Sequence, residues 1–585
     1  MSFVPKQEVA ATNEPLARRS DSAIPRWSDS KFLVIGSLVL FWFCLVTRIP
    51  LRSTFLSAYD PIEFALAIRH LDIIHHRPHP PGYIIYIGLA KLLSWLVHDP
   101  NLALTTLAAL FSALSTVLIF LLAFCMYGRR TALFASVIWA TCPLVWFYGL
   151  VGEMYAAAGF GSLATALSVF LFLRSPSRKT AAWAGGAYGL AAALRPDQLV
   201  LLAPLFLFPF WRSGACRRWA TFAFCPALAF YASWYLPTLA SVGGYRNYAQ
   251  LVRTQFSETV GRGSVLFGAP PVAHIWMVAL LISGLALGLL PLLAILPVSW
   301  ALRRPSARAS WSGQNEVLLL AVWAGPFLLF YSLIFISKVG YCMACLPPIL
   351  LALSSWVVAR VVGPDQRKAE KFWSLVSLSV VVNASVFLFV PRLPDPMATQ
   401  RPYRLSQSLR EAANLSILSC EYDQIRFDQS VKDRYVPKLQ KLLLRGDSAI
   451  VLIQSMPREC LNALFLDYYF QSVPVYAVIG LGAAVPGVHY PLKGGPIEPA
   501  IQSGWHPKGI GSERNPTLAV AKARVLLLYS RSLHVSVNER NGSARELVTE
   551  GGDDRSDIYQ VIVLHLTPTS SVDITSDGQT ISIVE

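Results

Sequence analysis

Ionisable side chains crowd into one short segment, residues 58–86, which reads AYDPIEFALAIRHLDIIHHRPHPPGYIIY. Asp60 and Glu63 lie near its start, and paired carboxylates are typical of sites that move protons during catalysis. A simpler role is also open, because Asp60 can cap a helix that begins at Pro61, with Glu63 closing a capping box. Capping explains the positions of the two carboxylates but not the density of ionisable groups that follows them.

Three histidines follow in the same segment, at positions 75, 76 and 79. Histidine is a common metal ligand. However, His75 and His76 are adjacent and His79 precedes two prolines, which is no recognised ligand spacing. The sequence therefore favours a site without a resident metal, and a divalent cation such as Mg²⁺ or Mn²⁺ stays open as the alternative.

A helix followed by a turn is predicted to hold these side chains. Phe64, Ala67, Ile68 and Leu71 recur at helical spacing and form one apolar face. We therefore expect an amphipathic helix that lies on the outer surface of a membrane. A proline-rich stretch ends this helix, and Gly82 permits a sharp turn after it.

The composition indicates that the chain is a membrane protein. Of its 585 residues, 54% are hydrophobic and only 14% are charged, and the mean hydropathy is +0.47. An ordinary soluble domain has about 25% charged residues, and disorder requires low hydrophobicity with high charge, so both classes are excluded. The net charge of +16 is the kind of excess that membrane proteins collect in cytoplasmic loops. It gives no reason to expect a nucleic-acid partner.

Apolar runs of near-membrane length predict about 11 spans. The runs are 32–46, which no cleavage site follows, and then 102–127, 131–150, 156–173, 181–194, 198–211, 219–240, 273–301, 315–336, 342–360 and 372–391. Basic residues recur in alternating loops, which places those loops and the arm 1–31 in the cytoplasm. The apolar stretch Tyr83–Val97 is short. If it crossed the membrane, every later basic loop would face outward. We therefore predict that it is an interfacial helix within a first outer loop, 48–101, because all basic loops then face the cytoplasm. The short pair 181–194 and 198–211 fits either two spans or a re-entrant hairpin.

The composition changes near residue 392, where charged residues return. A helical stretch at 430–445 and strand-length apolar runs predict a small extracytoplasmic α/β domain over 392–585, after a transmembrane domain over 32–391. The runs are 449–453, 473–479, 525–529, 559–566 and 581–584. Cys420 and Cys460 both lie in this domain and could pair in an oxidising compartment, although spacing alone does not establish the geometry.

Short motifs in the predicted outer loops resemble those of one enzyme family. After the Asp60 segment with its PHPPGY turn come GEMY at 152–155, LRPD at 194–197 and KVGY at 338–341, the last followed by LPP at 346–348. In this order they resemble the polyprenyl-phosphate-sugar-dependent glycosyltransferases of the GT-C fold, and more narrowly the family-39-like and protein O-mannosyltransferase-like members. The resemblance covers about residues 32–360 well and the rest weakly. The predicted topology rests on Lys and Arg residues alone, yet it places all of these motifs on the outer side of the membrane.

The resemblance implies roles for individual residues. Asp60 would be the general base, with Glu63 as the second candidate, and Glu153 would assist the base, position the acceptor or bind a divalent cation. The donor phosphate would be bound by Arg195 and Lys338, with Arg69, Arg77 and His79 behind them, and the substrates would be contacted by Tyr83, Tyr155, Asp197 and Tyr341. Each residue alone could instead be an interfacial anchor, but their joint occurrence in order favours a site.

The implied function is sugar transfer from a polyprenyl-phosphate donor to a hydroxyl of a glycan, lipid or protein acceptor, with inversion, at the outer face of a bacterial inner membrane. The sequence has no convincing glycine-rich nucleotide-binding loop, which suits a lipid-linked donor. The alternative is a non-catalytic transporter or flippase of lipid-linked saccharides. A transporter is expected to have internal repeats and polar groups near the bilayer midplane. Here the polar groups lie in loops on one side, which favours the enzyme.

Overall fold

The computed structural model describes most of the helical part of the chain and the regular elements of the C-terminal part. The described residues are 27–56, 58–260, 263–301, 313–362, 369–390, 420, 422–443, 448–454, 463–470, 473, 475–479, 487–489, 517–519, 524–530, 536–540, 544–547, 559–566, 571–576 and 579–584. The predicted N-terminal arm up to residue 26, the predicted domain boundary at 391–392 and Cys460 lie outside these residues.

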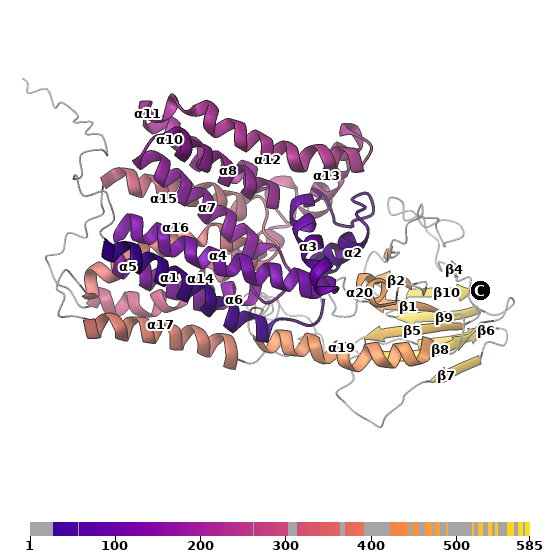
Figure 1. The fold of residues 1–585 in the computed structure, drawn as a ribbon. Helices are drawn as coiled ribbons and strands as arrows, with labels where there is room; N and C mark the ends of the chain where they lie inside the picture. The colour runs from indigo at the N-terminus through magenta and orange to yellow at the C-terminus, as the bar shows by residue number, and fades with distance from the viewer. Residues whose placement is uncertain are drawn as a thin grey trace, which may run out of the picture.

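Helices make up the first part of the chain (Figure 1). They are α1 (Trp27–Arg48), α2 (Tyr59–Arg69), α3 (Ile84–Val97), α4 (Pro100–Tyr127), α5 (Arg129–Thr141), α6 (Pro143–Tyr148), α7 (Tyr155–Arg174), α8 (Arg178–Leu194), α9 (Gln198–Leu201), α10 (Ala203–Arg212), α11 (Gly214–Arg217), α12 (Ala220–Ser241), α13 (Tyr245–Thr259), α14 (Pro271–Ala301), α15 (Gly313–Leu333), α16 (Leu346–Val357) and α17 (Ala369–Phe389). Short η helices are η2 (Ile49–Leu51), η3 (Val265–Phe267), η4 (Val339–Ala344) and η5 (Val358–Val362).

Each apolar stretch predicted to span the membrane contains a helix. Among the described residues, six helical segments are long and apolar enough to cross a bilayer: Asp29–Leu51, Pro100–Tyr127, Tyr155–Arg174, Pro271–Leu296, Glu316–Leu333 and Ala369–Phe389. Shorter apolar helices accompany them at Ile84–Val97, Gln198–Arg212 and Leu346–Val361. The chain is therefore an integral membrane protein.

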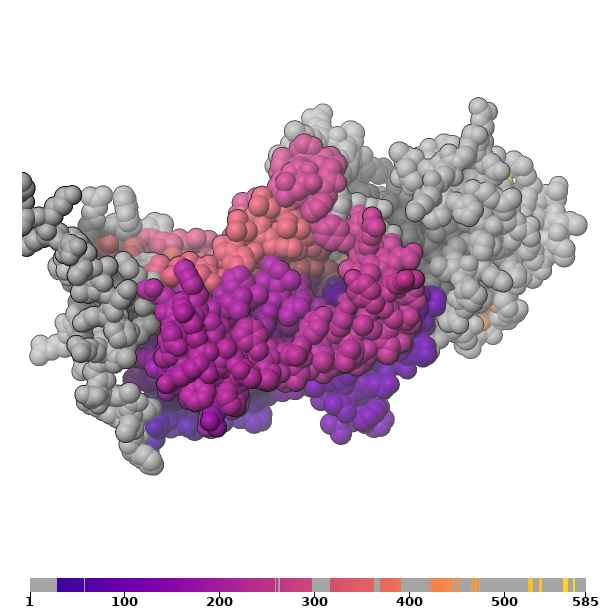
Figure 2. Space-filling view, turned by 90° about the horizontal axis from the view of Figure 1, so that it is seen from above, coloured from indigo at the N-terminus to yellow at the C-terminus, as the bar shows by residue number. Residues whose placement is uncertain are grey.

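Small residues let the helices of this bundle approach closely. Gly185 and Gly189 of α8 face α12, and a Cβ atom on Gly185 would lie 1.7 Å from the backbone oxygen of Ala223. Only glycine fits there, because the two backbones nearly touch, as is common in membrane helix pairs. Figure 2 shows α12 and α13, in magenta, at the surface of the helical body.

The stretch that we predicted to be an interfacial helix forms the helix α3, which packs beside α2 and α4. It lies at the end of the bundle next to the C-terminal strands (Figure 1), and we call this the sheet-side end. The short pair of apolar stretches forms α8 and then α9–α10, which meet at Arg195-Pro196-Asp197.

Among its described residues, the C-terminal part forms two sheets and two helices. The helices are α19 (Tyr422–Leu443) and α20 (Ala463–Tyr469). One sheet has the order β3 (Gly487–His489), β2 (Val475–Ile479), β1 (Ser448–Gln454), β5 (Arg524–Ser530), β8 (Tyr559–His565), β7 (Ala544–Leu547). The other has the order β4 (Thr517–Ala519), β10 (Gln579–Val584), β9 (Ser571–Ser576), β6 (Ser536–Arg540). In the first sheet β1 runs parallel to β2 and β5, and Val451 pairs with Tyr476 and Leu527. The predicted fold class, a helical membrane part followed by a small α/β part, is confirmed.

Candidate functional site

The structure corrects two expectations for the helix that follows the first span. The N-cap residue of α2 is Ala58 rather than Asp60, and it provides no side-chain cap hydrogen bond, so the predicted capping box of Asp60 and Glu63 is wrong. Both side chains are engaged elsewhere, as described below. The helix is also buried along Pro61–Ile68 rather than lying on a membrane surface with one face exposed, because neighbouring helices enclose it.

Two carboxylates share one ammonium group at the sheet-side end. Lys338 Nζ donates to Asp60 Oδ2 at 2.9 Å and to Glu153 Oε1 at 2.8 Å. The three side chains come from the first turn of α2, the loop before α7 and the residue before η4. The Glu153 side chain is 6% exposed, whereas those of Asp60 and Lys338 are 26% and 31% exposed. Glu153 is therefore the deepest member of the cluster, and the other two face its open side.

The two carboxylates differ in their affinity for protons. Burial would raise the pKa of Asp60, but the charges of Lys338 and His79 outweigh it and lower this pKa to about 2. Burial raises the pKa of Glu153 to about 7, with the Asp60 charge adding to the effect and Lys338 opposing it. Burial would lower the pKa of Lys338, but the two carboxylates raise it. Near neutral pH, Asp60 and Lys338 are therefore charged and Glu153 holds a proton about half of the time.

The buried guanidinium group of Arg195 lies against two tyrosine rings that also contact each other, with their centres 5.2 Å apart. Arg195 Nε donates to Asp197 Oδ1 at 3.0 Å, and the guanidinium carbon lies 4.8 Å from the ring centre of Tyr155 and 4.3 Å from that of Tyr341. These distances allow cation–π attraction to both rings. Arg195 Nη1 is buried and has no hydrogen-bond partner among the residues that the structure describes. A buried charged donor without a partner is costly, so this nitrogen is available to an anionic ligand.

Close packing of aromatic rings fixes this arrangement. A Cβ atom on Gly340 would lie 2.5 Å from the Tyr155 ring and 2.6 Å from the Tyr148 ring, so the KVGY motif needs glycine at its third position. The Tyr148 ring packs edge-on against Tyr155, and the Tyr331 ring packs edge-on against Tyr341. Tyr148 and Tyr331 were not predicted as site residues. The only sequence feature that points to them is a tyrosine near the end of an apolar run.

The remaining residues of the first loop form a layer beside this cluster. Glu63 Oε2 accepts hydrogen bonds from the backbone and the Nδ1 atom of His79. Burial would lower the pKa of His79, but the Glu63 carboxylate raises it. The His79 ring packs edge-on against Tyr83, which holds a left-handed backbone conformation with φ of 42°. Such a conformation is strained for a tyrosine, which indicates that the surrounding turn determines where this ring points.

Arg69, one of the predicted phosphate-binding residues, lies apart from the cluster. Arg69, in the last turn of α2, is about 14 Å along the helix from Asp60, at 1.5 Å per residue. Its guanidinium carbon lies 4.4 Å from the ring centre of Tyr468 in α20. Arg77 closes a turn through backbone hydrogen bonds with Asp72. The structure therefore brings together Asp60, Glu153 and Lys338, and it groups Arg195 with Asp197, Tyr155 and Tyr341, whereas Arg69 lies apart from Asp60.

Known proteins with similar sequences support the resemblance. No family model matches the chain. A protein of Pectobacterium carotovorum subsp. carotovorum, named undecaprenyl phosphate-alpha-4-amino-4-deoxy-L-arabinose arabinosyl transferase, is 25% identical over 345 residues, covering 55% of this chain and 59% of the relative. A protein of the same name from Pectobacterium atrosepticum is 24% identical over 348 residues, with the same coverage. The resemblance to polyprenyl-phosphate-sugar-dependent glycosyltransferases is confirmed.

The similarity is partial in extent. The chain spans 59% of the length of the two relatives that it matches. Among solved structures, the crystal structure of ArnT from Cupriavidus metallidurans bound to undecaprenyl phosphate superposes with a TM-score of 0.49 at 13% identity, covering 77% of this chain and 92% of that chain.

The carboxylates do not form a convincing metal site. The Lys338 ammonium already bonds Asp60 and Glu153, which are the two carboxylates that a divalent cation would need. Within the described part of the chain, no group of three or more His, Cys, Asp or Glu side chains is arranged to hold a metal ion. Glu153 Oε2 is buried and has no hydrogen-bond partner there, which is consistent with a carboxyl group that holds a proton.

Proposed function

We propose that this protein transfers a sugar from a polyprenyl-phosphate donor to a hydroxyl acceptor, with Asp60 as general base. The observation that carries the proposal is the ion-paired cluster of Asp60, Glu153 and Lys338, together with Arg195, which lies against Tyr155, two residues after Glu153. The Arg195 Nη1 atom is buried without a hydrogen-bond partner among the described residues. Carboxylates and cations side by side supply what such a transfer needs. One group accepts the hydroxyl proton, and the others stabilise the charge that develops on the departing phosphate.

The reaction we propose is a single displacement at the anomeric carbon, which inverts its configuration. The acceptor oxygen bonds to this carbon as its proton moves to Asp60, and the bond from the carbon to the phosphate oxygen breaks. Polyprenyl phosphate leaves with the bonding electron pair, next to Arg195 and Lys338. Glu153 accepts a hydrogen bond from Lys338 and so helps to position the ammonium group. When Glu153 is protonated, the charges of Asp60 and Lys338 balance and the cluster is neutral.

Donor binding makes Asp60 a better base in this scheme. A pKa of about 2 describes a weak base, and efficient bases have a pKa nearer to the working pH. The positive charge of Lys338 lowers the pKa of Asp60. A donor phosphate that draws the ammonium group toward itself therefore weakens this effect on Asp60. The pKa of Asp60 then rises, and proton transfer becomes more favourable once the donor is in place.

The other predicted residues support these steps. Asp197 and the rings of Tyr155 and Tyr341 orient the Arg195 guanidinium. Tyr83 contacts substrate from the strained turn, and the Glu63–His79 pair holds that turn. We assign no step to Arg69 or Arg77, or to a metal ion.

We place the reaction at the outer face of a bacterial inner membrane, with the C-terminal domain on the same side. The alternating basic loops support this orientation, and the acceptor is a glycan, lipid or protein that reaches this face. The names of the two relatives support undecaprenyl phosphate as the lipid carrier.

The test is sugar transfer by purified protein in proteoliposomes, with a radiolabelled undecaprenyl-phosphate sugar and a cell-envelope extract as acceptor. We expect Asp60→Asn to lower the transfer rate by about 10²–10⁴-fold, the usual contribution of a general base. Asp72→Asn is the matched control, because Asp72 is a carboxylate of the same loop that pairs with His75 instead. Transfer that survives Asp60→Asn undiminished would refute the assigned base. Movement of the donor across the bilayer without any transfer would support the transporter.

A further inference from the structure

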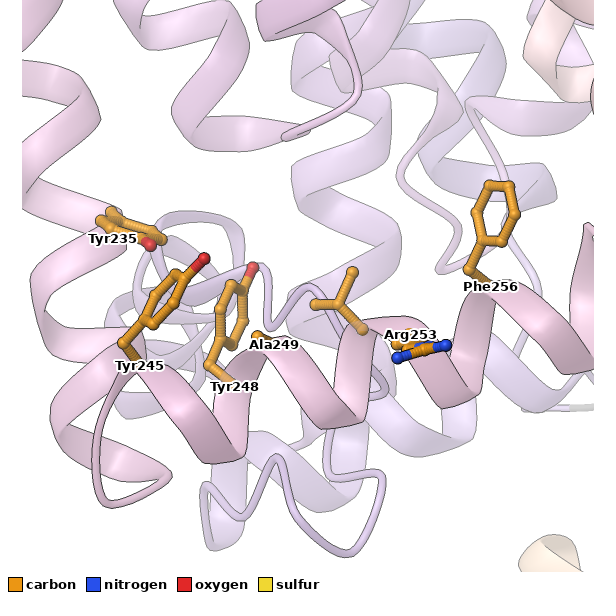
Figure 3. A pocket seen from close by; sticks show the side chains of 7 residues that line it. Tyr235, Tyr245, Tyr248, Ala249, Arg253 and Phe256 are labelled. Carbon is orange, nitrogen blue, oxygen red and sulfur yellow. The ribbon is translucent and has the colours of Figure 1, made fainter.

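A groove of about 420 Å³ lies on α13, outside the charged cluster (Figure 3). Its volume is in the range of small-molecule sites. Its lining consists of Tyr235 from the end of α12 and of Tyr245, Tyr248, Ala249, Val252, Arg253 and Phe256 from α13. The residues from α13 recur three or four positions apart and so share one face of that helix.

Two of the three tyrosines in the groove are held in place. The rings of Tyr235 and Tyr248 pack edge to face with centres 5.8 Å apart, and Tyr231 stacks on Tyr235. Tyr248 is 8% exposed, and its hydroxyl group donates to the Pro81 carbonyl at 3.4 Å. Tyr245, in contrast, is 66% exposed. Figure 3 shows the three rings in a row with their hydroxyl groups on the same side of α13.

The chemistry of this lining suits a sugar. A pyranose ring has an apolar C–H face and an edge of hydroxyl groups, and tyrosine offers a flat apolar ring with a hydroxyl at its tip. Arg253 is exposed and makes no ion pair with any residue that the structure describes. Among the side chains that the structure describes, no carboxylate lines the groove. The occupant is therefore neutral or acidic rather than basic.

Isolated tyrosines at a membrane interface also bind headgroups as an aromatic belt. That role requires neither stacking between the rings nor a fixed hydroxyl group. Here the Tyr248 hydroxyl is bonded to the backbone of the first loop, and its ring packs in one cluster with Ile73 and Val242. The exposed Trp95 of α3 serves as a reference for the belt role, because it is 65% exposed and is not among the lining residues of the groove.

The floor of the groove connects directly to the candidate site. Tyr248 bonds Pro81, two residues before Tyr83, and the Thr238 side chain lies against Gly82, where a Cβ atom would be 3.3 Å away. We propose that this groove binds a sugar ring of the acceptor and so determines which acceptor is used. The inference rests on the proposed function, and it names a carbohydrate as the class of acceptor.

A binding experiment tests the groove without any turnover. The full-length protein in nanodiscs is mixed with neutral and acidic oligosaccharides, maltotriose and a hyaluronan tetrasaccharide, and saturation transfer from protein to sugar protons is measured by NMR. We expect transfer to at least one of them and about tenfold weaker binding in Tyr245→Ala or Arg253→Ala, because one aromatic or charged contact is lost. Trp95→Ala should bind as the wild type does. If neither sugar binds, or if all three variants bind alike, the proposal is overturned.

A kinetic experiment connects the groove to the reaction. In the transfer assay, Tyr245→Ala and Arg253→Ala should raise the KM for the acceptor about tenfold and leave the KM for the donor unchanged. Delipidated acceptor glycan is compared with the intact glycolipid fraction, which separates a soluble glycan from a lipid headgroup as the source of the sugar. An unchanged acceptor KM in both variants overturns the assignment even if transfer occurs. If no transfer occurs but oligosaccharides still bind through Tyr245, the proposed function fails and the binding site stands.

Discussion

Replacing Glu153 by glutamine removes a titration that the fold shifts strongly. Burial raises the pKa of Glu153 from an ordinary 4.5 to about 7. At about 1.4 kcal/mol for each pKa unit, this shift corresponds to about 3 kcal/mol. The folded state binds the proton more tightly than the unfolded state, so this stabilisation is fully present below pH 4.5. It is lost as the pH rises to about 7.

The free energy of unfolding of the wild type therefore contains a decline of about 3 kcal/mol between pH 4.5 and pH 7 that comes from Glu153. Glutamine keeps the shape of the side chain and does not titrate, so the variant should lack this decline. The assay is denaturant unfolding in detergent micelles at several pH values, followed by tryptophan fluorescence. The informative quantity is the difference between variant and wild type, because all other groups titrate in both proteins.

The exposed Glu370 at the start of α17 gives the matched control, since Glu370→Gln should keep the pH dependence of the wild type. A Glu153→Gln variant with that same dependence would refute the assignment of the proton to Glu153.

A second readout is the binding of the donor lipid. Above pH 7, two ionised carboxylates face one ammonium, so binding of undecaprenyl phosphate to the wild type should weaken with pH, while binding to the variant should not.

Three further changes test other parts of the structure. Arg195→Lys should weaken undecaprenyl phosphate binding at least tenfold in a lipid-binding assay, since lysine lacks the planar group that can contact both rings and still offer a further nitrogen to an anion. Gly340→Ala should lower the free energy of unfolding by about 1–3 kcal/mol, because its Cβ atom would meet the Tyr155 ring; equal stability would show that the rings yield easily. Single cysteines at His98 and Ser175, both exposed, should react with an impermeant thiol reagent from the outer and the cytoplasmic side respectively, and reversed labelling would invert the topology.

Much of the fold follows from apolar patterning along the chain. The long apolar runs form helices because a bilayer requires every backbone polar group to be bonded within the segment. The strands predicted in the C-terminal part, such as β1 and β5, are continuous apolar runs. The strands β6, β7 and β9 were not predicted, because their sequences SVNER, AREL and SVDITS carry no apolar run. Their position depends on backbone pairing with neighbours that lie elsewhere in the sequence.

The candidate site was predictable as a set of residues but not as an arrangement. Loop position selected Asp60, Glu153, Arg195 and Lys338, because polar groups at the edge of an apolar helix are costly unless they have a function. The pairing of Lys338 with Asp60 joins residues 278 positions apart, and no local pattern encodes it. Local rules also gave a wrong answer, since the capping box satisfied sequence preferences that the tertiary ion pair overrides.

The C-terminal domain contacts the Asp60 helix near both of its ends. Before α2, the ring of Phe55 packs against that of Phe465 in α20, with centres 5.1 Å apart, and at the end of α2 the Arg69 guanidinium lies over Tyr468. We therefore expect a shift of α20 to act on both ends of α2 and to move Asp60 relative to the Lys338 ammonium. The hydrogen bond from Lys338 to Asp60 is 2.9 Å long, and displacements of about 1 Å are enough to disable a catalytic geometry. Arg69, expected from the sequence to bind phosphate, thus lies where it can fix the position of the proposed base instead.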